Sequence, residues 1–409
     1  MVIQLRVLTF NCWGLKYISK HREERIRYIG EELARGRYDV VALQEIWVEK
    51  DYQSICDKVK NVLPYHHYFH SGCIGSGLCI LSKWPIVNTF LHRFSLNSYA
   101  YRVFEGDWFA GKGVGFCELE VEDMTVNVYT LHNTALYAPS SITSADHLFT
   151  HRLLQNYEVS EFVRVTGASS DVNIVTGDFN TEDFSLGFEV VKVNAGLKDA
   201  WKKCTNQDTK DQPCCTVETA DNCYTHIQTK YYVDYSGMRI DFILYGSNPG
   251  CSVTCRDRSL TMEKIPATDM HYSDHKGVEV LFEMHKVKDE RAPKKSLENA
   301  EERLAILLQL LPFIQSSIQD VKEQSISYLI KSLIIFLFLI FIWIGGLFHW
   351  MTSWSSLGAL GVFVAVVVLG VTAFCIGGFV KRTELNLLVG KKREITLQVK
   401  RLESLVRQS

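Results

Sequence analysis

Side chains suited to metal binding and acid–base chemistry recur beside short apolar runs of this sequence. They are Asn11, Glu45, Asp178, Asn180, Asp241, Asp274 and His275. A hard cation such as Mg²⁺ prefers carboxylate and amide oxygens, and a histidine oriented by a carboxylate can take a proton from water. Taken together, these residue types predict metal-assisted hydrolysis of a phosphoester. Taken singly, a carboxylate after a strand is more often a turn former or a helix cap.

The metal ligands are expected to come from separate segments of the chain. Glu45 in ALQEIW supplies a carboxylate, Asn11 in LTFNCWG an amide oxygen, and Asp274 in HYSDHKG a second carboxylate. Asp178 in VTGDFN is a further candidate. All of these are oxygen donors, which favours Mg²⁺ as the cofactor.

The expected general base is His275. A carboxylate inside RIDFILY needs a partner if it is buried, so Asp241 is expected to orient His275 and to raise its basicity. Asp178 and Asn180 are expected to position the attacking water. His132 in TLHNT is expected to hydrogen-bond the phosphoryl oxygens.

The stretch Gly106 to Gly115 reads GDWFAGKGVG, which is close to the phosphate-binding loop GxxxxGK[ST]. Such a loop must open a helix whose N-terminus faces the phosphates. Here VGFCELEVED follows and alternates like a strand, and Gly113 stands where the Ser or Thr that binds Mg²⁺ should be. The sequence therefore excludes a nucleotide loop. Lys112 beside Asp107 is a candidate for binding a phosphodiester or headgroup, although a solvated surface lysine fits the motif equally well.

Short β-rich runs separated by helical patterns must position these residues. The runs are IQLRVLTF, DVVALQEIW, GLCILSK, GVGFCELEV, TVNVYTL, DVNIVTGDF, RIDFILYG and GVEVLFEMH. The clearest helical patterns cover residues 20–35 and 145–165. Strands interleaved with helices, several of them adjacent as hairpin pairs, predict an α/β catalytic domain over residues 1–285, in which two packed sheets form a β-sandwich flanked by helices.

The C-terminal region predicts a membrane anchor. Ser332 to Val380 contains no Asp, Glu, Lys or Arg, and about 20 apolar residues are enough for one helical span. We therefore expect two transmembrane helices within residues 327–380, joined at HWMTSWSS. A buried core helix pair is the alternative, but a charge-free run of this length disfavours it.

Flanking charge predicts the orientation of this hairpin. Lys322 and Lys331 precede it, Lys381 and Arg382 follow it, and the connecting turn carries no charge. Because positive ends stay cytoplasmic, the N-terminal domain and the basic tail helix (381–409) are both expected to face the cytosol. The expected location is an intracellular membrane (ER or Golgi) or the plasma membrane, in a multi-pass protein.

Segments on either side of the hairpin also have helical patterns. Residues 286–326 form an expected juxtamembrane linker and helix, broken at Pro312, and the tail repeats apolar residues at heptad-like spacing. One hypothesis is that the two segments pair antiparallel, with the acidic Glu298, Glu301 and Glu302 region facing the tail. The alternative is that the tail, with eight Lys or Arg against three Glu, lies against anionic lipids.

Charge and cysteine usage exclude other classes of protein. The formal net charge is −2, and the surplus of positive charge is confined to the tail, so we expect no nucleic-acid partner. Cys204, Cys214, Cys215 and Cys223 cluster without a standard zinc spacing. In a reducing compartment they are expected to be mostly free thiols.

The motifs FNCWG, LQEIW, GDFN, RIDFILY and SDHKG resemble the endonuclease/exonuclease/phosphatase superfamily. FNCWGLKYISKHREERI, SGCIGSGLCILSKWPI and GDWFAGKGVG, followed by two spans, resemble the Mg²⁺-dependent neutral sphingomyelinases of the short, membrane-anchored type. The resemblance covers most of residues 1–285. It implies a two-sheet sandwich that hydrolyses sphingomyelin to ceramide and phosphocholine, using water activated by a metal ion and a histidine.

The resemblance also implies roles for individual residues. They are Glu45 as the metal-binding glutamate, Asn11 as the asparagine of the first motif, Asp178 and Asn180 as the GDxN pair, His275 as the base and Asp241 as its support. Asp107 and Lys112 resemble an aspartate–lysine switch in which the lysine meets the substrate. One segment departs from the family, because TLHNTALY stands where relatives carry THLHAEY. His132 matches the first histidine, whereas Thr134 and Leu136 replace the second histidine and the glutamate.

Two other functions stay open at this point. Lysophosphocholine lipids are a plausible second substrate of the same phospholipase C chemistry. A catalytically silent membrane scaffold could keep the sandwich, but it has no need to keep the complete set of polar residues. A nuclease of the same superfamily would need a basic face over its catalytic domain, and this domain is net acidic.

Overall fold

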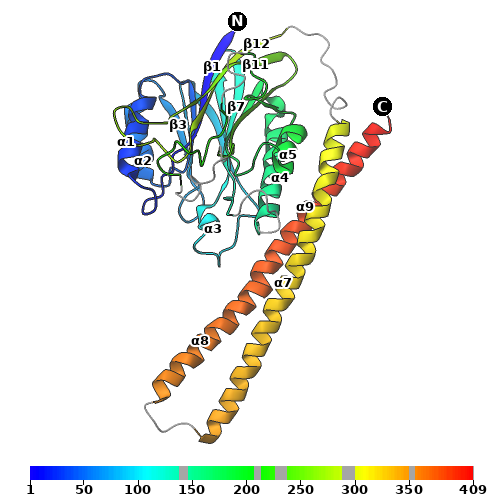
Figure 1. Cartoon of the computed structure of the whole chain (residues 1–409). Coiled ribbons are helices and arrows are strands. Elements are labelled where there is room, and N and C mark those ends of the chain that lie inside the picture. The colour runs from blue at the N-terminus through cyan, green and yellow to red at the C-terminus, as the bar shows by residue number, and fades with distance from the viewer. Residues whose placement is uncertain (138–145, 207–212, 226–236, 288–299, 350–354, 409) are drawn as a thin grey trace. The chain divides into compact units, whose positions relative to one another are not determined.

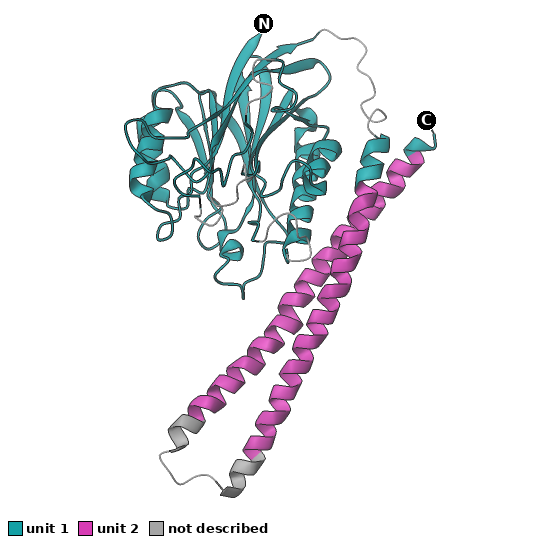
Figure 2. Ribbon diagram, in the orientation of Figure 1, with its two compact units in different colours: residues 1–306, 405–409 teal, residues 307–404 magenta. Residues whose placement is uncertain are grey.

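The structure is a computed structural model of the whole chain. It describes residues 1–137, 146–206, 213–225, 237–287, 300–349 and 355–408. Figure 1 shows the arrangement of the elements. The chain forms two compact units, Met1–Ile306 with Leu405–Ser409 and Leu307–Ser404 (Figure 2). We describe each unit separately.

The first unit alternates strands and helices along most of its length. Its strands are β1 (Ile3–Asn11), β2 (Val40–Gln44), β3 (Tyr65–Phe69), β4 (Leu78–Ser82), β5 (Ile86–Arg93), β6 (Gly113–Val121), β7 (Met124–His132), β8 (Val172–Asp178), β9 (Lys198–Asp199), β10 (Asp241–Ser247), β11 (Cys251–Thr261) and β12 (Gly277–Lys286). Its helices are α1 (Arg22–Leu33), α2 (Glu49–Val59), α3 (Asp107–Ala110), α4 (Phe149–Thr166) with the 3₁₀ turn η2 (Gly167–Ser169), and α5 (Leu186–Ala195). The helical patterns at 20–35 and 145–165 correspond to α1 and α4.

The described strands form two six-stranded sheets, in the orders β11-β12-β1-β2-β4-β3 and β5-β6-β7-β8-β10-β9. The pairs β1/β2 and β7/β8 are parallel, and the other neighbours are antiparallel. Helices α1 and α2 cover one sheet, and α4 and α5 cover the other (Figure 1). The predicted α/β fold of two packed sheets flanked by helices is confirmed.

The two-residue period of a strand explains how one sheet can be buried on both faces. In β1, Leu5 and Val7 belong to the apolar cluster between the sheets, whereas Leu8 and Phe10 pack with Ile29 of α1. Successive side chains of a strand point to opposite faces. Because each face of β1 is covered, the run IQLRVLTF is apolar on both faces toward its end rather than strictly alternating.

The register of the strands gathers polar residues at one end of the sandwich. Asn11 ends β1, His132 ends β7 and Asp178 ends β8, and Asp241 begins the antiparallel strand β10. His132 is aligned with Asp178, and Asp178 with Asp241, across neighbouring strands. We call this end the site end. In Figure 1 it is the end that carries α3, away from the N-terminus.

The second unit consists of long helices. It contains most of α7 (Ala300–His349), then α8 (Ser355–Cys375), the π-helical turn η4 (Ile376–Val380) and most of α9 (Lys381–Val406). Two of the described helical stretches are long and apolar enough to cross a membrane. Most of the turn predicted at HWMTSWSS, and Glu298, lie outside the described residues.

Helix α7 continues through Pro312, so the predicted break at that residue is wrong. A proline removes one N–H donor and crowds the preceding turn, which a helix can absorb by bending when its flanks are packed. Leu310 and Ile314 on either side are buried. Farther along, Lys392 of α9 donates a hydrogen bond to Gln315 of α7 (2.5 Å). This contact agrees with the hypothesis that the two segments pair.

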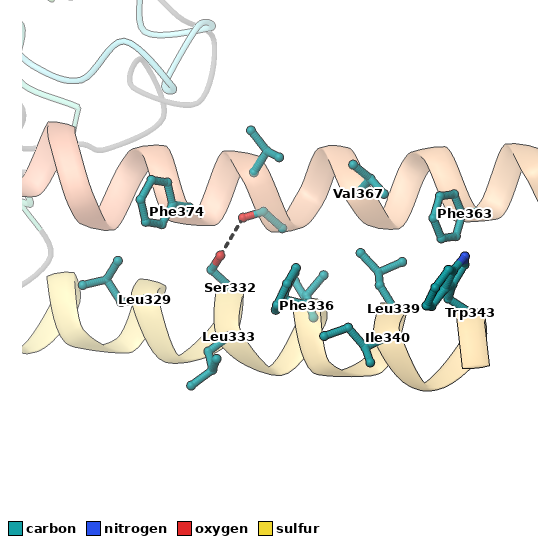
Figure 3. A pocket seen from close by; sticks show the side chains of 13 residues that line it. Leu329, Ser332, Leu333, Phe336, Leu339, Ile340, Trp343, Phe363, Val367 and Phe374 are labelled. Carbon is teal, nitrogen blue, oxygen red and sulfur yellow. Dashed lines mark hydrogen bonds between the residues drawn. The ribbon is translucent and has the colours of Figure 1, made fainter. Parts of the chain in front are cut away.

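Figure 3 shows a cavity of about 720 Å³ between α7 and α8. The helices are joined where Ser332 Oγ donates to the carbonyl of Gly370 (2.9 Å). A Cβ on Gly370 would lie 2.9 Å from Ile335 Cγ2, so a small residue permits this close approach. At the far end of the cavity, Trp343 and Phe363 face each other across the two helices. The lining of the cavity is mostly apolar.

Candidate active site

The side chain of Asn11 joins the two sheets at the site end. Its Nδ2 donates to Glu45 Oε1 and to Asp178 Oδ2, each at 3.0 Å. Asn11 and Glu45 belong to the β1/β2 side of the sandwich, and Asp178 ends β8 in the other sheet. Asn11 directs its nitrogen, rather than the oxygen that a cation needs, at the two carboxylates, and its Oδ1 accepts from Trp13 N (2.9 Å). The role of Asn11 as a metal ligand stays a prediction, and it would require the side-chain amide to flip so that its oxygen and nitrogen exchange positions.

Two glycines, Gly14 and Gly77, allow neighbouring loops to approach the backbone of Glu45 more closely than a residue with a Cβ could. Glu45 has a left-handed φ of 58°, an uncommon conformation for a residue other than glycine that often marks a functional site. A Cβ on Gly14 would lie 2.2 Å from the Glu45 carbonyl oxygen, and a Cβ on Gly77 would lie 3.2 Å from Glu45 Cα. The glycines of FNCWG and GSG therefore bring the first loop and the β3–β4 loop against the glutamate.

His275 and Asp241 form the expected pair. His275 Nδ1 and Asp241 Oδ2 are 2.8 Å apart, and both side chains are buried. Burial by itself lowers the pKa of His275, but the charge of Asp241 and its hydrogen bond outweigh burial and raise that pKa well above the ordinary value. Thr216 supports the pair, because its Oγ1 accepts from Asp241 N (3.3 Å). The bond at Nδ1 leaves His275 Nε2 as the nitrogen that can exchange a proton.

Asp178 lies next to this pair. The ligand atoms of Asp178, Asp241 and His275 all lie within 4.8 Å of one another. Burial, followed by the negative charge of Asp241, raises the pKa of Asp178 to about 7. Asp241 Oδ1 is buried and has no hydrogen-bond partner among the described residues. A buried cluster of acidic oxygens with an unpartnered atom is an environment that a cation would stabilise.

Asp274 adds a fourth carboxylate. Burial raises its pKa to about 6, the charge of His275 opposes that shift, and the charge of Glu45 adds to it. Its Oδ1 accepts from Ser273 Oγ (3.1 Å). The ligand atoms that lie within 4.8 Å of one another among the described residues are those of Asp178, Asp241 and His275, and Asn11 links Asp178 to Glu45. Asp274 is close enough to Glu45 and His275 for their charges to act on its pKa, and its role as a metal ligand stays a prediction.

Lys112 reaches the same place from the loop before β6. Its Nζ contacts Asp107 Oδ1 (2.7 Å), His132 Nε2 (3.1 Å) and the carbonyl oxygen of Asn133 (2.9 Å). Lys112 is only 3% exposed, so the alternative of a solvated surface lysine is wrong. The strand β6 follows directly at Gly113, which confirms that GDWFAGKG is no nucleotide loop.

His132 lies between the lysine and the carboxylates. Its Nε2 is 3.5 Å from Asp178 Oδ2 and 4.0 Å from Glu45 Oε1. Burial and then the positive charges of Lys112 and His275 lower its pKa well below the ordinary value. A neutral imidazole in this position can donate one hydrogen bond and accept another.

Asn180 is held in place by its neighbours. It has a left-handed φ of 46°, which asparagine tolerates better than most residues. Its backbone N–H donates to Asp178 Oδ1 (2.9 Å) and its Nδ2 to the Asn133 carbonyl (3.1 Å). The Asn133 carbonyl therefore receives both Asn180 and Lys112, a role that sequence reasoning missed. The only available signal was its place next to His132.

The segment that departs from the family pattern has its own network. Gln155 of α4 accepts from Thr134 N (2.9 Å) and donates to Thr134 Oγ1 (2.7 Å). Leu136 N is 3.4 Å from Asn180 Oδ1. These contacts fix the loop after β7 without the second histidine and the glutamate, so His132 keeps its position beside Asp178.

Arg25 is a second residue that sequence reasoning missed. It is fully buried in α1, and its guanidinium donates to the carbonyls of Cys12 (2.8 Å), Trp13 (2.7 Å) and Tyr272 (3.0 Å). These carbonyls lie in the loop after Asn11 and in the segment before His275. Arg25 thus ties together two loops that carry site residues. Within REERIRYIGEEL nothing distinguishes it from its charged neighbours.

Sequence comparison places this geometry among known proteins. Residues 8–275 match the Endonuclease/Exonuclease/phosphatase family. The chain is 36% identical over 347 residues to a Caenorhabditis elegans protein named as a neutral sphingomyelinase, covering 81% of this chain and 78% of that protein. It is 36% identical to sphingomyelin phosphodiesterase 2 of Mus musculus, covering 68% and 64%. It is 32% identical to inositol phosphosphingolipids phospholipase C of Schizosaccharomyces pombe, covering 68% and 68%.

Comparison with solved structures supports the fold alone. Beta toxin of Staphylococcus aureus superimposes with a TM-score of 0.51 at 19% identity, over 68% of this chain and 99% of that chain. The family match and the extent of the nematode alignment are the stronger findings. This chain belongs to the endonuclease/exonuclease/phosphatase family and, within it, to the neutral sphingomyelinases.

Proposed function

We propose that this chain hydrolyses sphingomyelin to ceramide and phosphocholine with the help of a divalent cation. The observation that carries the proposal is the convergence of Glu45, Asn11 and Asp178 with the His275–Asp241 pair at one end of the sandwich. The names of the similar animal proteins support sphingomyelin as the substrate. The reaction is the cleavage of a phosphodiester by water.

The cation is proposed to be Mg²⁺, held by Glu45 with Asp274 and, after a turn of its amide, Asn11. When bound, such a cation neutralises charge on the phosphodiester and polarises a phosphoryl oxygen. The oxygen donors described above match the preference of Mg²⁺. Asp178 lies close enough to contribute, because Asn11 bonds both carboxylates.

The proton transfer is assigned to His275. Its Nδ1 is occupied by Asp241, so Nε2 would take a proton from the attacking water while Asp241 stabilises the charged ring. Asp178 and Asn180 would orient that water. Against the effect of burial, the charge of Asp241 stabilises the protonated ring and so raises the pKa of His275. The positive charge of a bound cation would lower that pKa again and leave the ring able to accept a proton.

Lys112 and His132 would bind the phosphodiester itself. Lys112 is buried and paired with Asp107 (2.7 Å). If the lysine turned toward an anionic oxygen, the Asp107 carboxylate would keep its hydrogen bonds from Ala135 N (3.2 Å) and Tyr137 OH (2.9 Å), which lower the cost of separating the pair. His132, which is neutral by the direction of its pKa, accepts from Lys112 at Nε2 in this structure. With Lys112 turned toward the phosphodiester, Nε2 would carry the ring proton and donate to a second phosphoryl oxygen. Both contacts strengthen as negative charge develops on the phosphoryl group.

A phosphocholine-release assay on the full chain tests the proposal. We expect release from sphingomyelin that stops on addition of EDTA and returns with Mg²⁺. His275→Ala should lower the rate by about 10² to 10⁴, the range for loss of a general base. His285→Ala is the matched control, since His285 lies at the opposite end of β12. A His275→Ala chain that keeps more than about a tenth of the rate would point to another base.

The same assay shows which lipid headgroup the chain prefers. The yeast relative is named for inositol phosphosphingolipids, and lysophosphatidylcholine carries the same headgroup as sphingomyelin. All three lipids should therefore be compared at equal surface concentration. A silent scaffold would release nothing from any of them.

The membrane position is also a proposal. Two helices are candidates for spanning a membrane, and we infer a multi-pass protein of the ER, Golgi or plasma membrane with residues 1–285 and the tail in the cytosol. Lys322, Lys331, Lys381 and Arg382 flank the hairpin on one side. Anionic lipids are a proposed partner of the basic tail. A glycosylation acceptor placed at Ser353 should be modified, and one placed at Ser409 should not.

A further inference from the structure

Three loops emerge at the site end because of the direction in which their strands run. β1 ends at the site end, and so do β3 and β5, which run antiparallel to β4 and β6. The loops 12–21, 70–77 and 94–112 therefore all emerge at this end. They carry Gly14, Gly77 and Lys112, which contact Glu45 or His132 directly.

These loops expose large apolar side chains. They are Tyr17, Ile18, Ile74, Val103, Phe104 and Trp108, with exposed fractions from 41% to 107%. We call this set the apolar rim. Single exposed apolar residues are ordinary, but several of them on loops that emerge at one end of the sandwich indicate an interaction surface. Phe104 is the most exposed of the set, and none of the residues that the structure describes covers it.

Backbone contacts fix two of the loops that carry the apolar rim, 70–77 and 94–112, against each other. Cys73 N and Ile74 N donate to the Phe109 carbonyl at 2.8 and 3.2 Å. A Cβ on Gly111 would lie 2.5 Å from Gly72 N, so the β3–β4 loop and the α3 turn are in close contact. Asn97 Nδ2 also donates to the Asp107 carbonyl (3.1 Å). A surface whose backbone is already fixed loses little conformational freedom when it binds.

We propose that the apolar rim inserts into the interface of the lipid bilayer that contains the substrate. The choice of a lipid occupant rests on the proposed function, because a lipid diester that reaches the buried site must arrive from a membrane surface. The composition agrees: aromatic and aliphatic tips stand beside the exposed Lys16 and Lys20. Tyr and Trp suit the headgroup region, and lysines suit an anionic surface.

The rim also explains how the site can be buried and still reach a lipid. Lys112 and Asp178 are nearly inaccessible, so a headgroup must leave the plane of the membrane to reach them. A rim that sinks into the interface shortens that path and excludes water at the entrance. Trp108 belongs to the short helix α3 and Lys112 follows two residues after its end, which places the lipid contact close to the catalytic groups.

Photocrosslinking tests the contact on the full chain in sphingomyelin-containing liposomes. A diazirine-bearing amino acid replaces Phe104, and in a matched control it replaces Val165. Val165 is 64% exposed near the end of α4, which leads to the start of β8 at the opposite end of the sandwich. We expect lipid adducts at position 104 to exceed those at 165 by at least about fivefold. Equal adduct yields, or crosslinks only to another protein chain, would overturn the proposal.

A kinetic comparison gives an independent readout. Phe104→Ser with Trp108→Ser should lower the ratio of sphingomyelin hydrolysis in vesicles to hydrolysis of a water-soluble phosphocholine ester by about tenfold. Val165→Ser should leave that ratio unchanged. An unchanged ratio in the double variant would refute the proposal that the apolar rim inserts into the lipid interface. If the unaltered chain cleaves neither substrate, the proposed function fails instead, while the crosslinking comparison still reports on the rim.

Discussion

Replacing Gly14 by alanine should disable the site through its backbone. The new Cβ would lie 2.2 Å from the carbonyl oxygen of Glu45, whereas ordinary contact begins at 3.4 Å. The loop that carries Gly14 and the segment that carries Glu45 must therefore move apart by about 1.2 Å. The obstructing atom is backbone and cannot rotate away. Since a misplacement of about 1 Å at a catalytic centre can cost about 10²-fold in rate, we expect Gly14→Ala to lose about that much activity.

The assay is phosphocholine release from sphingomyelin as a function of Mg²⁺ concentration. Because the displaced group is the proposed metal ligand Glu45, the half-saturating Mg²⁺ concentration should rise along with the loss of rate. Glu45→Ala serves as the reference for complete loss of the ligand. Gly390→Ala is the matched control, since a Cβ at Gly390 meets nothing within 4 Å.

Thermal unfolding separates a local effect from a global one. The Gly14→Ala chain should remain folded, because the clash involves one loop at the edge of the core. If Gly14→Ala retained full activity and an unchanged Mg²⁺ requirement, the close approach of the two loops would not position Glu45, and the reasoning from backbone contact would be refuted.

Two further perturbations follow from the structure. Asp241→Asn should lower the rate of phosphocholine release at saturating substrate by about 10² or more, because the amide cannot stabilise a charged His275. Asp257→Asn on β11 is the control and should change this rate little. A near-normal rate for Asp241→Asn would exclude the His275–Asp241 pair as the base. Deleting residues 383–409 removes nearly all of α9 and its contact with Gln315, so the detergent-solubilised chain should unfold at a lower temperature. An unchanged unfolding temperature together with unchanged micellar activity would show that α7 does not depend on α9.

The sequence by itself determined the classes of element and the chemistry they carry. The alternating runs predict strands because side chains of a strand point to opposite faces, and the uncharged run from Ser332 to Val380 predicts membrane spans because hydrocarbon excludes charge. The motif around Lys112 was likewise resolved from its local pattern, since a strand rather than a helix follows it. Such patterns are local, so they can be recognised without knowing the fold.

Only the tertiary structure decided which of these residues meet. Asn11 and Asp178 are 167 positions apart and come together because two sheets pack with their ends in register. The burial of Lys112, the use of the Asn133 carbonyl and the loop-joining role of Arg25 depend on the same packing. None of them has a local signal, because a buried donor or acceptor is defined by the neighbours that surround it and not by its own sequence context.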